Sequence, residues 1–476
     1  MTTTDTSGYN NGTYSFEQQI FCISWSTILS FNYTGEAAAI AKQTKAMLTK
    51  VLQDEEIQTL IGVWHLVWGP GVSVGSWAGP GRAVNTMFII VPQTDPSQAV
   101  IAIAGTNGKS LMNWVLQDFN VRETVPWPYG KKSNVASIAC YLGPHWCGPQ
   151  REPRISKGIS LGLKNLVSIK SPQDHGTTAQ QYLASRPFKN IMVTGHSLGG
   201  ALSPCYSLYL EDTRSEWDTD GSTSISCLPT AGQTQGDTNF SKYYDSKLLA
   251  TTNRQWNSMD MVPHAFNSEM LDKIPKLYKQ CDLQSTPLVD LLVFLLKQST
   301  RKNNYLNVAP NTKGFESTCY DYDINNMRSQ YPATSDEIDQ VVNELKKDLD
   351  LSETNKNHTN TINFLTEALI QHSIGYIEYF DIGDFAQRMD AISQRTVTVM
   401  SRPTEAGVRI QTVLASLNTT PILMMELGQR SKDKIDDLKE GEGPLLDEIL
   451  ERVHQWNDGT PMENSQPLIF LIEEGW

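Results

Sequence analysis

The sequence predicts an α/β fold built around a mostly parallel sheet, and two patterns predict it. Short apolar stretches have the length and composition of buried strands, at Met87–Val91, Ala99–Ala104 and Asn190–Thr194. Segments that favour helix lie between or after them, at 160–169, 179–184 and 200–210. Strands that alternate with helices along a chain are typical of parallel sheets, because parallel neighbours need a crossover connection.

The N-terminal part of the chain is expected to be helical, because residues from about 15 to 60 favour helix formers over breakers. The first two expected strands flank the turn-rich segment Pro92–Ser97 and should pair as a hairpin. The third strand, Asn190–Thr194, runs into the small-residue helix at 200–210. A further strand is expected at Ser246–Thr251.

A long stretch between Glu269 and Asn363 differs in composition from its surroundings. Its polar loops connect two expected helices, at 287–298 and 335–349, and the second carries apolar side chains on one face. Another amphipathic helix is expected at 444–456. We therefore expect a helical N-terminal extension over 1–60, an α/β domain over 61–380 with an inserted helical region at about 270–363, and a C-terminal extension over 381–476 packed on the core.

Charge and apolar runs exclude several classes of partner. The 476 residues carry a net charge of −13, which disfavours nucleic acids and strongly anionic surfaces. The longest apolar run, Leu288–Leu296, contains Asp290 and is too short to span a bilayer. The opening residues lack the basic and apolar regions of a secretory signal. The compartment stays open between the cytoplasm, export by a non-classical route and a mature secreted form.

The cysteines predict no disulfide framework, because they are odd in number and widely spread. They are Cys22, Cys140, Cys147, Cys205, Cys227, Cys281 and Cys319. Unpaired thiols are the expected state, with Cys140 and Cys147, the closest pair in sequence, as the candidate bridge in an oxidising compartment.

The pattern Gly-x-Ser-x-Gly, which marks many serine nucleophiles, occurs three times, around Ser73, Ser160 and Ser197. A nucleophile elbow needs a buried strand before the serine and a helix directly after it. Ser73 lies between two glycine-proline loops, and Ser160 lies within a helical segment. Only Ser197 follows an apolar strand and precedes a helix, so it is the predicted nucleophile.

A serine nucleophile needs a histidine base and a carboxylate that orients it, and in α/β-hydrolases these follow the serine in the order acid, then histidine. Asp260 is the predicted acid, because it comes shortly after the strand expected at 246–251 and before the stiffening Pro263. Glu269 and Asp272 are weaker candidates in a more helical context.

Four histidines follow Asp260 in the chain. His264 is too close to Asp260 in sequence to reach both partners easily. His358 is expected in a solvated loop, and His454 on a helix surface. His372 precedes a compact apolar-aromatic segment that can hold its ring rigidly, so it is the predicted base.

Four short motifs, in this order, carry a family resemblance. They are Ile-Ala-Gly-Thr at 103–106, GHSLGG at 195–200, Asn-Ser-Met-Asp-Met-Val-Pro at 257–263, and His372 with Tyr376 four residues later. Together they resemble the class 3 lipases, the family of the filamentous-fungal triacylglycerol lipases. The resemblance covers roughly residues 85–380 and implies an α/β-hydrolase fold.

The resemblance also implies an oxyanion hole and a lid. The hole would use the backbone N–H and hydroxyl of Thr106 and the backbone N–H of Leu198. An amphipathic lid that meets a lipid–water interface would carry Leu111, Trp114, Val115, Leu116 and Phe119; a permanently packed helix is the alternative.

Three features depart from the family pattern. Ala104 stands where the family has an arginine, Pro204 lies inside the helix after the nucleophile and is expected to kink it, and the insertion lengthens the separation of Asp260 from His372.

The favoured function is a serine carboxylic-ester hydrolase, with triacylglycerols as favoured substrates and without cofactor or metal. No His-Glu-x-x-His occurs, and Asp321–Asn325 lacks the glycine and glutamate of a calcium loop. Phospholipase A1, monoacylglycerol lipase and short-chain esterase stay open, because pocket shape separates them. An inert lipase-like interaction module is the alternative from another class.

Overall fold

A computed structural model describes residues 11–75, 81–105, 121–130, 152–320, 329–349, 351–352, 354–393, 423–430 and 468–474. Within these ranges the central sheet has five strands in the order β1-β2-β3-β8-β9. The strands are β1 (Trp64–Val74), β2 (Ala83–Pro92), β3 (Gln98–Ile103), β8 (Asn190–His196) and β9 (Ser224–Thr230).

The sheet is mixed. The strands β3, β8 and β9 are parallel to one another, with Ile103 opposite Gly195 and His196 opposite Thr230. The strands β1, β2 and β3 are joined by antiparallel pairing, so the hairpin expected around Pro92–Ser97 is confirmed as β2 and β3. Because parallel strands end at the same edge, the segments after β3, β8 and β9 come together at one edge.

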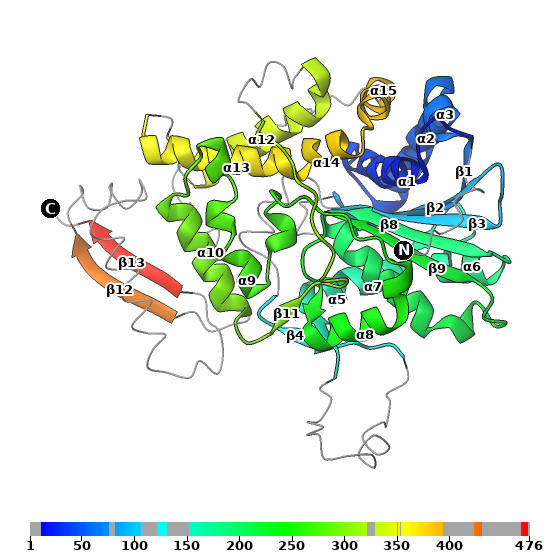
Figure 1. Cartoon of the computed structure of the whole chain (residues 1–476), viewed down its shortest axis with the longest axis horizontal. Coiled ribbons are helices and arrows are strands. Elements are labelled where there is room, and N and C mark those ends of the chain that lie inside the picture. Colours follow the sequence, from blue (N-terminus) through cyan, green and yellow to red (C-terminus); the bar gives the residue numbers. More distant parts are fainter. Residues whose placement is uncertain are drawn as a thin grey trace, which may run out of the picture.

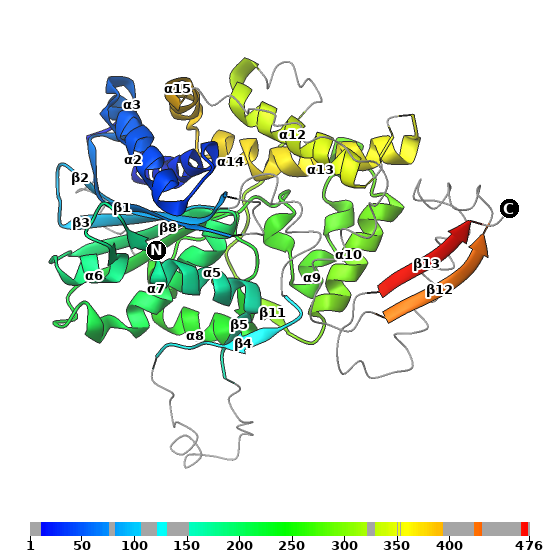
Figure 2. The same ribbon diagram turned by 180° about the vertical axis from the view of Figure 1, so that it is seen from behind.

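Helices cover both faces of the sheet (Figure 1 and, from behind, Figure 2). One face carries α1 (Phe16–Trp25), α2 (Ala37–Gln53) and α3 (Glu55–Ile61). The other carries α5 (Lys157–Ser168), α6 (Ala179–Ala184), α7 (Leu198–Asp212) and α8 (Thr238–Leu248). Side chains from α1, β2, β3, β8 and α7 belong to one continuous apolar core, so the N-terminal helices are packed into it.

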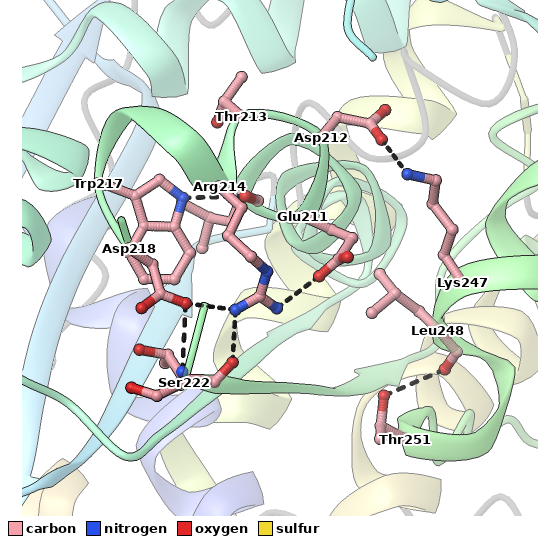
Figure 3. A network of polar contacts seen from close by, with 12 residues as sticks. Glu211, Asp212, Thr213, Arg214, Trp217, Asp218, Ser222, Lys247, Leu248 and Thr251 are labelled. Carbon is pink, nitrogen blue, oxygen red and sulfur yellow. Dashed lines mark hydrogen bonds and ion pairs between the residues drawn. The ribbon is translucent and has the colours of Figure 1, made fainter. Parts of the chain in front are cut away.

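The C-terminal end of α7 is fixed by a polar network (Figure 3). The buried Asp212 carboxylate accepts bonds from Lys247 Nζ (2.6 Å), Tyr243 Oη (2.9 Å) and Trp127 Nε1 (2.7 Å). Arg214 pairs with Glu211 (2.6 Å) and with Asp218. The network ties α7 to α8 and to the segment after β4, so the helix behind Ser197 has a rigid far end.

The inserted helices lie together beyond one side of the sheet in both views (Figures 1 and 2). They are α9 (Ser268–Leu271), α10 (Pro287–Thr300), α12 (Pro332–Asp348) and α13 (Lys356–His372). α14 (Ile374–Tyr379) and α15 (Gly383–Ser393) then bring the chain back to the N-terminal helices. Here Arg388 pairs with Asp54 at 2.7 Å.

The remaining elements are short or peripheral. A second sheet has the order β11-β10-β5-β4, formed by β4 (Thr124–Pro126), β5 (Arg154–Ser156), β10 (Gly236–Asp237) and β11 (Tyr305–Leu306). β6 (Lys170–Ser171) pairs with β7 (Thr177–Thr178), and β12 (Leu423–Arg430) pairs in parallel with β13 (Leu468–Glu474). The 3₁₀ helices include the seven-residue η1 (Ser26–Asn32) and the single turns η6 (Arg214–Glu216), η7 (Leu249–Thr251), η8 (Val262–His264), η9 (Ile274–Lys276) and η10 (Lys279–Cys281).

Three local expectations are wrong. The segment 246–251 is the end of α8 and η7 instead of a strand, while the next residues, Thr252 and Gln255, bridge β9 in parallel. The stretch around Ser73 is part of β1 instead of a loop. Cys281 and Cys319 form a disulfide, although no bridge was expected there.

Two further expectations cannot be compared with the fold, because Cys140, Cys147 and the helix at 444–456 lie outside the described residues.

Candidate active site

Ser197 occupies the sharp turn between β8 and α7. Its backbone has φ 60° and ψ −124°, a left-handed conformation that a residue with a side chain adopts only under constraint. Two glycines of the motif let the turn close. A Cβ on Gly199 would lie 2.2 Å from the carbonyl oxygen of Ile103, and one on Gly200 would lie 2.0 Å from that of Thr230. The motif therefore places α7 directly against the ends of β3 and β9.

The other two serines of the repeated pattern have no such geometry. Ser73 lies in β1, where its Oγ approaches Asn85 at 3.5 Å, and Ser160 lies within α5. Neither residue has a positive φ. Of the three predicted alternatives, only Ser197 lies on a strand-to-helix turn.

The backbone around Ser197 offers donors to a developing negative charge. Helix α7 begins at Leu198, so the N–H of Leu198 has no acceptor within the helix. Gly105 packs on the other side, where a Cβ would lie 2.7 Å from the His196 carbonyl oxygen and 3.1 Å from the Ser197 Cβ. The loop after β3 therefore starts against the serine. Its predicted oxyanion donor, Thr106, and the predicted lid residues lie outside the described residues.

Asp260 and His372 meet although 112 residues separate them. The distance between His372 Nδ1 and Asp260 Oδ2 is 2.7 Å, and the Asp260 side chain is fully buried. Two more donors reach the carboxylate: the backbone N–H of Val262 bonds Oδ1 at 2.9 Å, and the Tyr376 hydroxyl bonds Oδ2 at 3.0 Å. A carboxylate held in this way accepts a hydrogen bond from the Nδ1–H of His372, which leaves the Nε2 lone pair available.

Asn257 shapes the turn that carries Asp260. Its side-chain oxygen accepts the Met259 N–H at 2.9 Å, and its amide group bonds the Gln371 carbonyl at 3.0 Å. Its own N–H donates to the Tyr376 hydroxyl at 2.9 Å. One asparagine therefore connects the loop of the acid to the helix that ends at the base.

His196 connects the nucleophile to the base. Its Nε2 lies 2.9 Å from the His372 carbonyl oxygen, and since a carbonyl cannot donate, Nε2 carries the proton. The rings of His196 and His372 have centroids 5.0 Å apart. Because His196 directly precedes Ser197, this bond holds His372 beside the elbow. Among the described residues, Ser197 Oγ and His372 Nε2 are buried without a hydrogen-bond partner.

Burial keeps the supporting histidines neutral. It lowers the pKa of His196 well below the ordinary value, and the neighbouring His372 lowers it further. It also lowers the pKa of His264 to about 4. His264 donates from Nδ1 to the Asp260 carbonyl oxygen at 2.7 Å, so this histidine supports the acid's backbone. The same burial raises the pKa of Tyr376 well above its ordinary value, which keeps its hydroxyl protonated.

The weaker candidates lie elsewhere. Glu269 is exposed, and Asp272 pairs with Lys297 at 2.5 Å. His358, expected in a solvated loop, is instead buried in the first turn of α13, where its Nδ1 accepts the Ser352 N–H at 2.9 Å. His454 lies outside the described residues.

In their arrangement, the described residues form neither a cluster of metal ligands nor a helix able to span a membrane. No group of three or more histidine, cysteine or acidic side chains in this part of the chain is arranged to hold a metal ion. Likewise, none of its helices has the length and apolar character needed to cross a membrane.

Comparison with known proteins agrees with the family resemblance. Residues 154–270, which include Ser197 and Asp260, match the model of the class 3 lipase family. The crystal structure of M37 lipase is similar with a TM-score of 0.59 at 24% sequence identity, over 80% of this chain and 98% of that one. The predicted α/β-hydrolase fold and the resemblance to class 3 lipases are thereby confirmed.

Two more distant structural matches are fungal lipases. Lipase II from Rhizopus niveus has a TM-score of 0.33 and 15% identity, over 53% of this chain and 76% of that one. A lipase from Rhizopus microsporus var. chinensis has a TM-score of 0.32 and 16% identity, over 53% of this chain and 70% of that one. No curated protein matches the chain. The family match supports a lipase-type ester hydrolase.

Proposed function

We propose that the chain is a serine carboxylic-ester hydrolase that acts on acylglycerols, with triacylglycerols as preferred substrates. The observation that supports this most is the 2.7 Å bond between His372 and the buried Asp260, at the sheet edge where Ser197 lies on its elbow. The family match over 154–270 adds support from sequence.

In the proposed reaction, Ser197 Oγ attacks the ester carbonyl carbon while His372 Nε2 accepts the proton of the Ser197 hydroxyl. Asp260 stabilises the imidazolium. The tetrahedral oxyanion accepts a hydrogen bond from the Leu198 N–H and, as the family resemblance implies, from Thr106. His372 then protonates the leaving alcohol, and an acyl-enzyme remains. Water, deprotonated by His372, attacks this ester, and the fatty acid leaves as Ser197 recovers its proton.

Ser197 Oγ and His372 Nε2 make no hydrogen bond to each other here. Catalytic hydrogen bonds are often long in ligand-free enzymes and tighten when the substrate binds. We propose that substrate binding rotates the Ser197 hydroxyl towards His372, whose ring the Asp260 bond already orients.

The three repeated motifs provide a matched test. Ser197→Ala should lower the rate of p-nitrophenyl ester hydrolysis by on the order of 10⁵-fold, because no other group replaces the nucleophile. Ser73→Ala and Ser160→Ala should keep the full rate. A loss confined to the Ser160 variant would overturn the assignment. A fluorophosphonate should label Ser197, whereas an inert interaction module would stay unlabelled.

The substrate class needs a second measurement. Hydrolysis of triglycerides and p-nitrophenyl esters of increasing chain length should be followed below and above the solubility limit of each substrate. A lipase should show a rate increase above that limit, because aggregated lipid offers the interface at which it works. A smooth saturation curve through the limit would favour an esterase and contradict the triacylglycerol proposal.

A further inference from the structure

Two side chains of α13 are polar and buried, although neither takes part in the proposed reaction. Glu367 and Gln371 lie four residues apart on this helix, and Gln371 directly precedes His372. Glu367 is 1% exposed, and Gln371 is fully buried. Burying a carboxylate or an amide costs free energy unless its polar atoms are hydrogen-bonded. The partners of these two side chains therefore indicate what they do.

The side-chain amide of Gln371 is held in one orientation. Its Nε2 donates to Glu367 Oε1 at 2.8 Å and to the Thr318 carbonyl oxygen at 2.8 Å. A carboxylate and a carbonyl only accept hydrogen bonds, so the nitrogen of the amide must face them. The amide oxygen then faces Asn257, and it accepts a bond from Asn257 Nδ2 at 2.7 Å.

This orientation is passed on to the turn that carries the acid. Because Asn257 Nδ2 faces Gln371, the Asn257 side-chain oxygen is directed to the Met259 N–H, which it accepts at 2.9 Å. The Asn257 carbonyl oxygen accepts the Asp260 N–H at 3.0 Å. A chain of hydrogen bonds therefore runs from Glu367 through two amide side chains to the turn that holds Asp260.

The surroundings of Glu367 stay constant in charge over a wide pH range. Its Oε1 also accepts the Tyr320 N–H at 3.4 Å. Burial raises the pKa of Glu367, while its hydrogen bonds to Gln371 and Tyr320 lower it. In the part of the chain that the structure describes, the titratable side chains that face Glu367 are Tyr278 and Tyr320. Burial raises the pKa of Tyr278 well above its ordinary value and that of Tyr320 to about 12, so both hydroxyls stay protonated near neutral pH.

We propose that Glu367 and Gln371 are positioning residues for the proposed ester hydrolysis. They hold the Asn257 amide in one orientation, and Asn257 in turn holds Asp260 in line with the His372 ring. The inference rests on the proposed function, and neither residue touches the substrate. Helix α13 thus supplies the base at its last residue and, one turn earlier, the groups that orient the acid.

The variant Gln371→Glu tests this through pH. A protonated carboxyl at position 371 can still donate to Glu367 and accept from Asn257, whereas an ionised one cannot donate and repels Glu367. The kcat ratio of variant to parent should therefore be within about threefold of one near pH 6 and fall at least about tenfold towards pH 9. Taking the ratio removes the titration of His372, which both proteins share. A ratio that does not change with pH would overturn the proposal.

Two matched variants show whether the position of the carboxyl pair matters. Gln180 on α6 also donates to a glutamate, Glu216, at 3.4 Å, beside the far end of α7. Gln180→Glu should keep a kcat ratio near one at every pH. Glu367→Gln combined with Gln371→Glu returns an amide donor to the pair, so the ratio should lose its pH dependence. A pH-dependent ratio in either control would contradict the proposed relay.

Substitutions of Glu367 alone provide a test that does not depend on a second carboxylate. Glu367→Gln keeps an oxygen that can accept from Gln371, so kcat should stay within about threefold of the parent value. Glu367→Leu removes that acceptor, and kcat should fall about tenfold while KM changes less than about twofold. Equal kcat values for the two variants would contradict the proposal.

A measurement without turnover separates the positioning from the reaction. The Nδ1 proton of His372, identified by the loss of its NMR signal in His372→Gln, reports the bond to Asp260 directly. Between Gln371→Glu and the parent protein, the difference in this signal should grow as pH rises. If it does so in a protein that hydrolyses no ester, the proposed function fails and the positioning stands. If ester hydrolysis proceeds and neither the signal nor the kcat ratio responds to pH, the positioning fails and the function stands.

Discussion

At the scale of single residues, Asp260 is held by donors on both of its carboxylate oxygens. His372 and Tyr376 reach Oδ2, and the backbone N–H of Val262 reaches Oδ1. A fully buried carboxylate needs such partners, because its charge has lost its contact with water. These hydrogen bonds therefore stabilise the negative charge of the Asp260 carboxylate. They also set the orientation of the His372 ring.

Removing the Tyr376 hydroxyl tests this support. Tyr376→Phe deletes the donor to Asp260 Oδ2 and leaves the buried Asn257 N–H without its acceptor. We expect kcat/KM for ester hydrolysis to fall about 10- to 100-fold, which corresponds to about 1–3 kcal/mol. Tyr379→Phe is the control, because that exposed hydroxyl contacts Gln255 instead. Equal activity of the two variants would contradict the role of Tyr376.

The buried His264 predicts how stability depends on pH. Its folded-state pKa of about 4 lies below the ordinary value of 6.5, so the unfolded chain binds a proton more readily. The free energy of unfolding should therefore decrease as pH falls from about 6.5 to about 4, by about 3 kcal/mol from this group alone. Urea unfolding at several pH values measures this. His264→Gln should flatten the curve in that window; an unchanged slope would contradict the assignment.

Sequence reasoning predicts the residues of the proposed reaction but not their supports. Ser197, Asp260 and His372 could be selected because each lies in a local pattern that restricts its chemistry. The contacts of His196 with His372 and of Asn257 with Gln371 join residues 176 and 114 positions apart. His196 and Asn257 stand in the motifs at 195–200 and 257–263, but a motif does not say which distant residues its members contact, because that depends on how the elements pack.

At the scale of elements, β8 and α7 form the rigid unit that presents Ser197. The strand is buried between β3 and β9, and the helix starts at Leu198 and continues through Pro204 to Asp212. Strain at the serine persists only where the surrounding structure enforces it. Packing of Gly199 and Gly200 against the neighbouring strands enforces it, and the polar network anchors the far end of α7 (Figure 3).

Asp212→Ala tests the far end of this unit. The substitution leaves Lys247, Tyr243 and Trp127 without the acceptor that they share. We expect the free energy of unfolding to fall by about 3 kcal/mol, because a buried charge partner and several hydrogen bonds are lost together. Glu316→Ala, which removes the exposed partner of Lys313, should change stability by less than about 1 kcal/mol. Similar values for both in denaturant unfolding would contradict the account.

Local patterns predicted β2, β3, β8 and α7 but missed β1 and β9, and they placed a strand wrongly at 246–251. The last error has a physical reason. The segment 246–251 is apolar enough for a strand, but it continues a helix that starts after Asp237, whose side chain caps the Phe240 N–H. The N-cap signal lies nine residues before the apolar run. The strand propensity of a short segment is a weak preference that depends on its context. Here the helix that Asp237 caps continues into the segment and overrides that preference.

At the scale of the whole molecule, the chain between Asp260 and His372 leaves the sheet, forms the inserted helices and returns. The disulfide between Cys281 and Cys319 closes a loop of 38 residues within this excursion. Sequence spacing gave no reason to pair these two cysteines, since their proximity follows from the path of the insertion. The expected domain boundaries at residues 60 and 380 remain predictions. So does the extent of the inserted region, at about 270–363.

Reduction of this disulfide should loosen the insertion. In the loop-entropy model, closing a loop of this length stabilises the folded state by about 4 kcal/mol. We expect dithiothreitol to lower the thermal unfolding midpoint of the protein. A variant with Cys281→Ser and Cys319→Ser should start at the lower midpoint and show no further change. If reduction leaves the midpoint of the parent protein unchanged, the bridge does not contribute as proposed.

The central claim is that Ser197, His372 and Asp260 act together on an ester. The most direct measurement is a crystal structure of the protein after reaction with a p-nitrophenyl phosphonate. The account predicts a covalent bond from Ser197 Oγ to phosphorus, with the phosphoryl oxygen facing the Leu198 N–H and His372 Nε2 within hydrogen-bond distance of the adduct. An adduct on another residue, or a His372 ring that points away from Ser197 with its Asp260 bond broken, would contradict it.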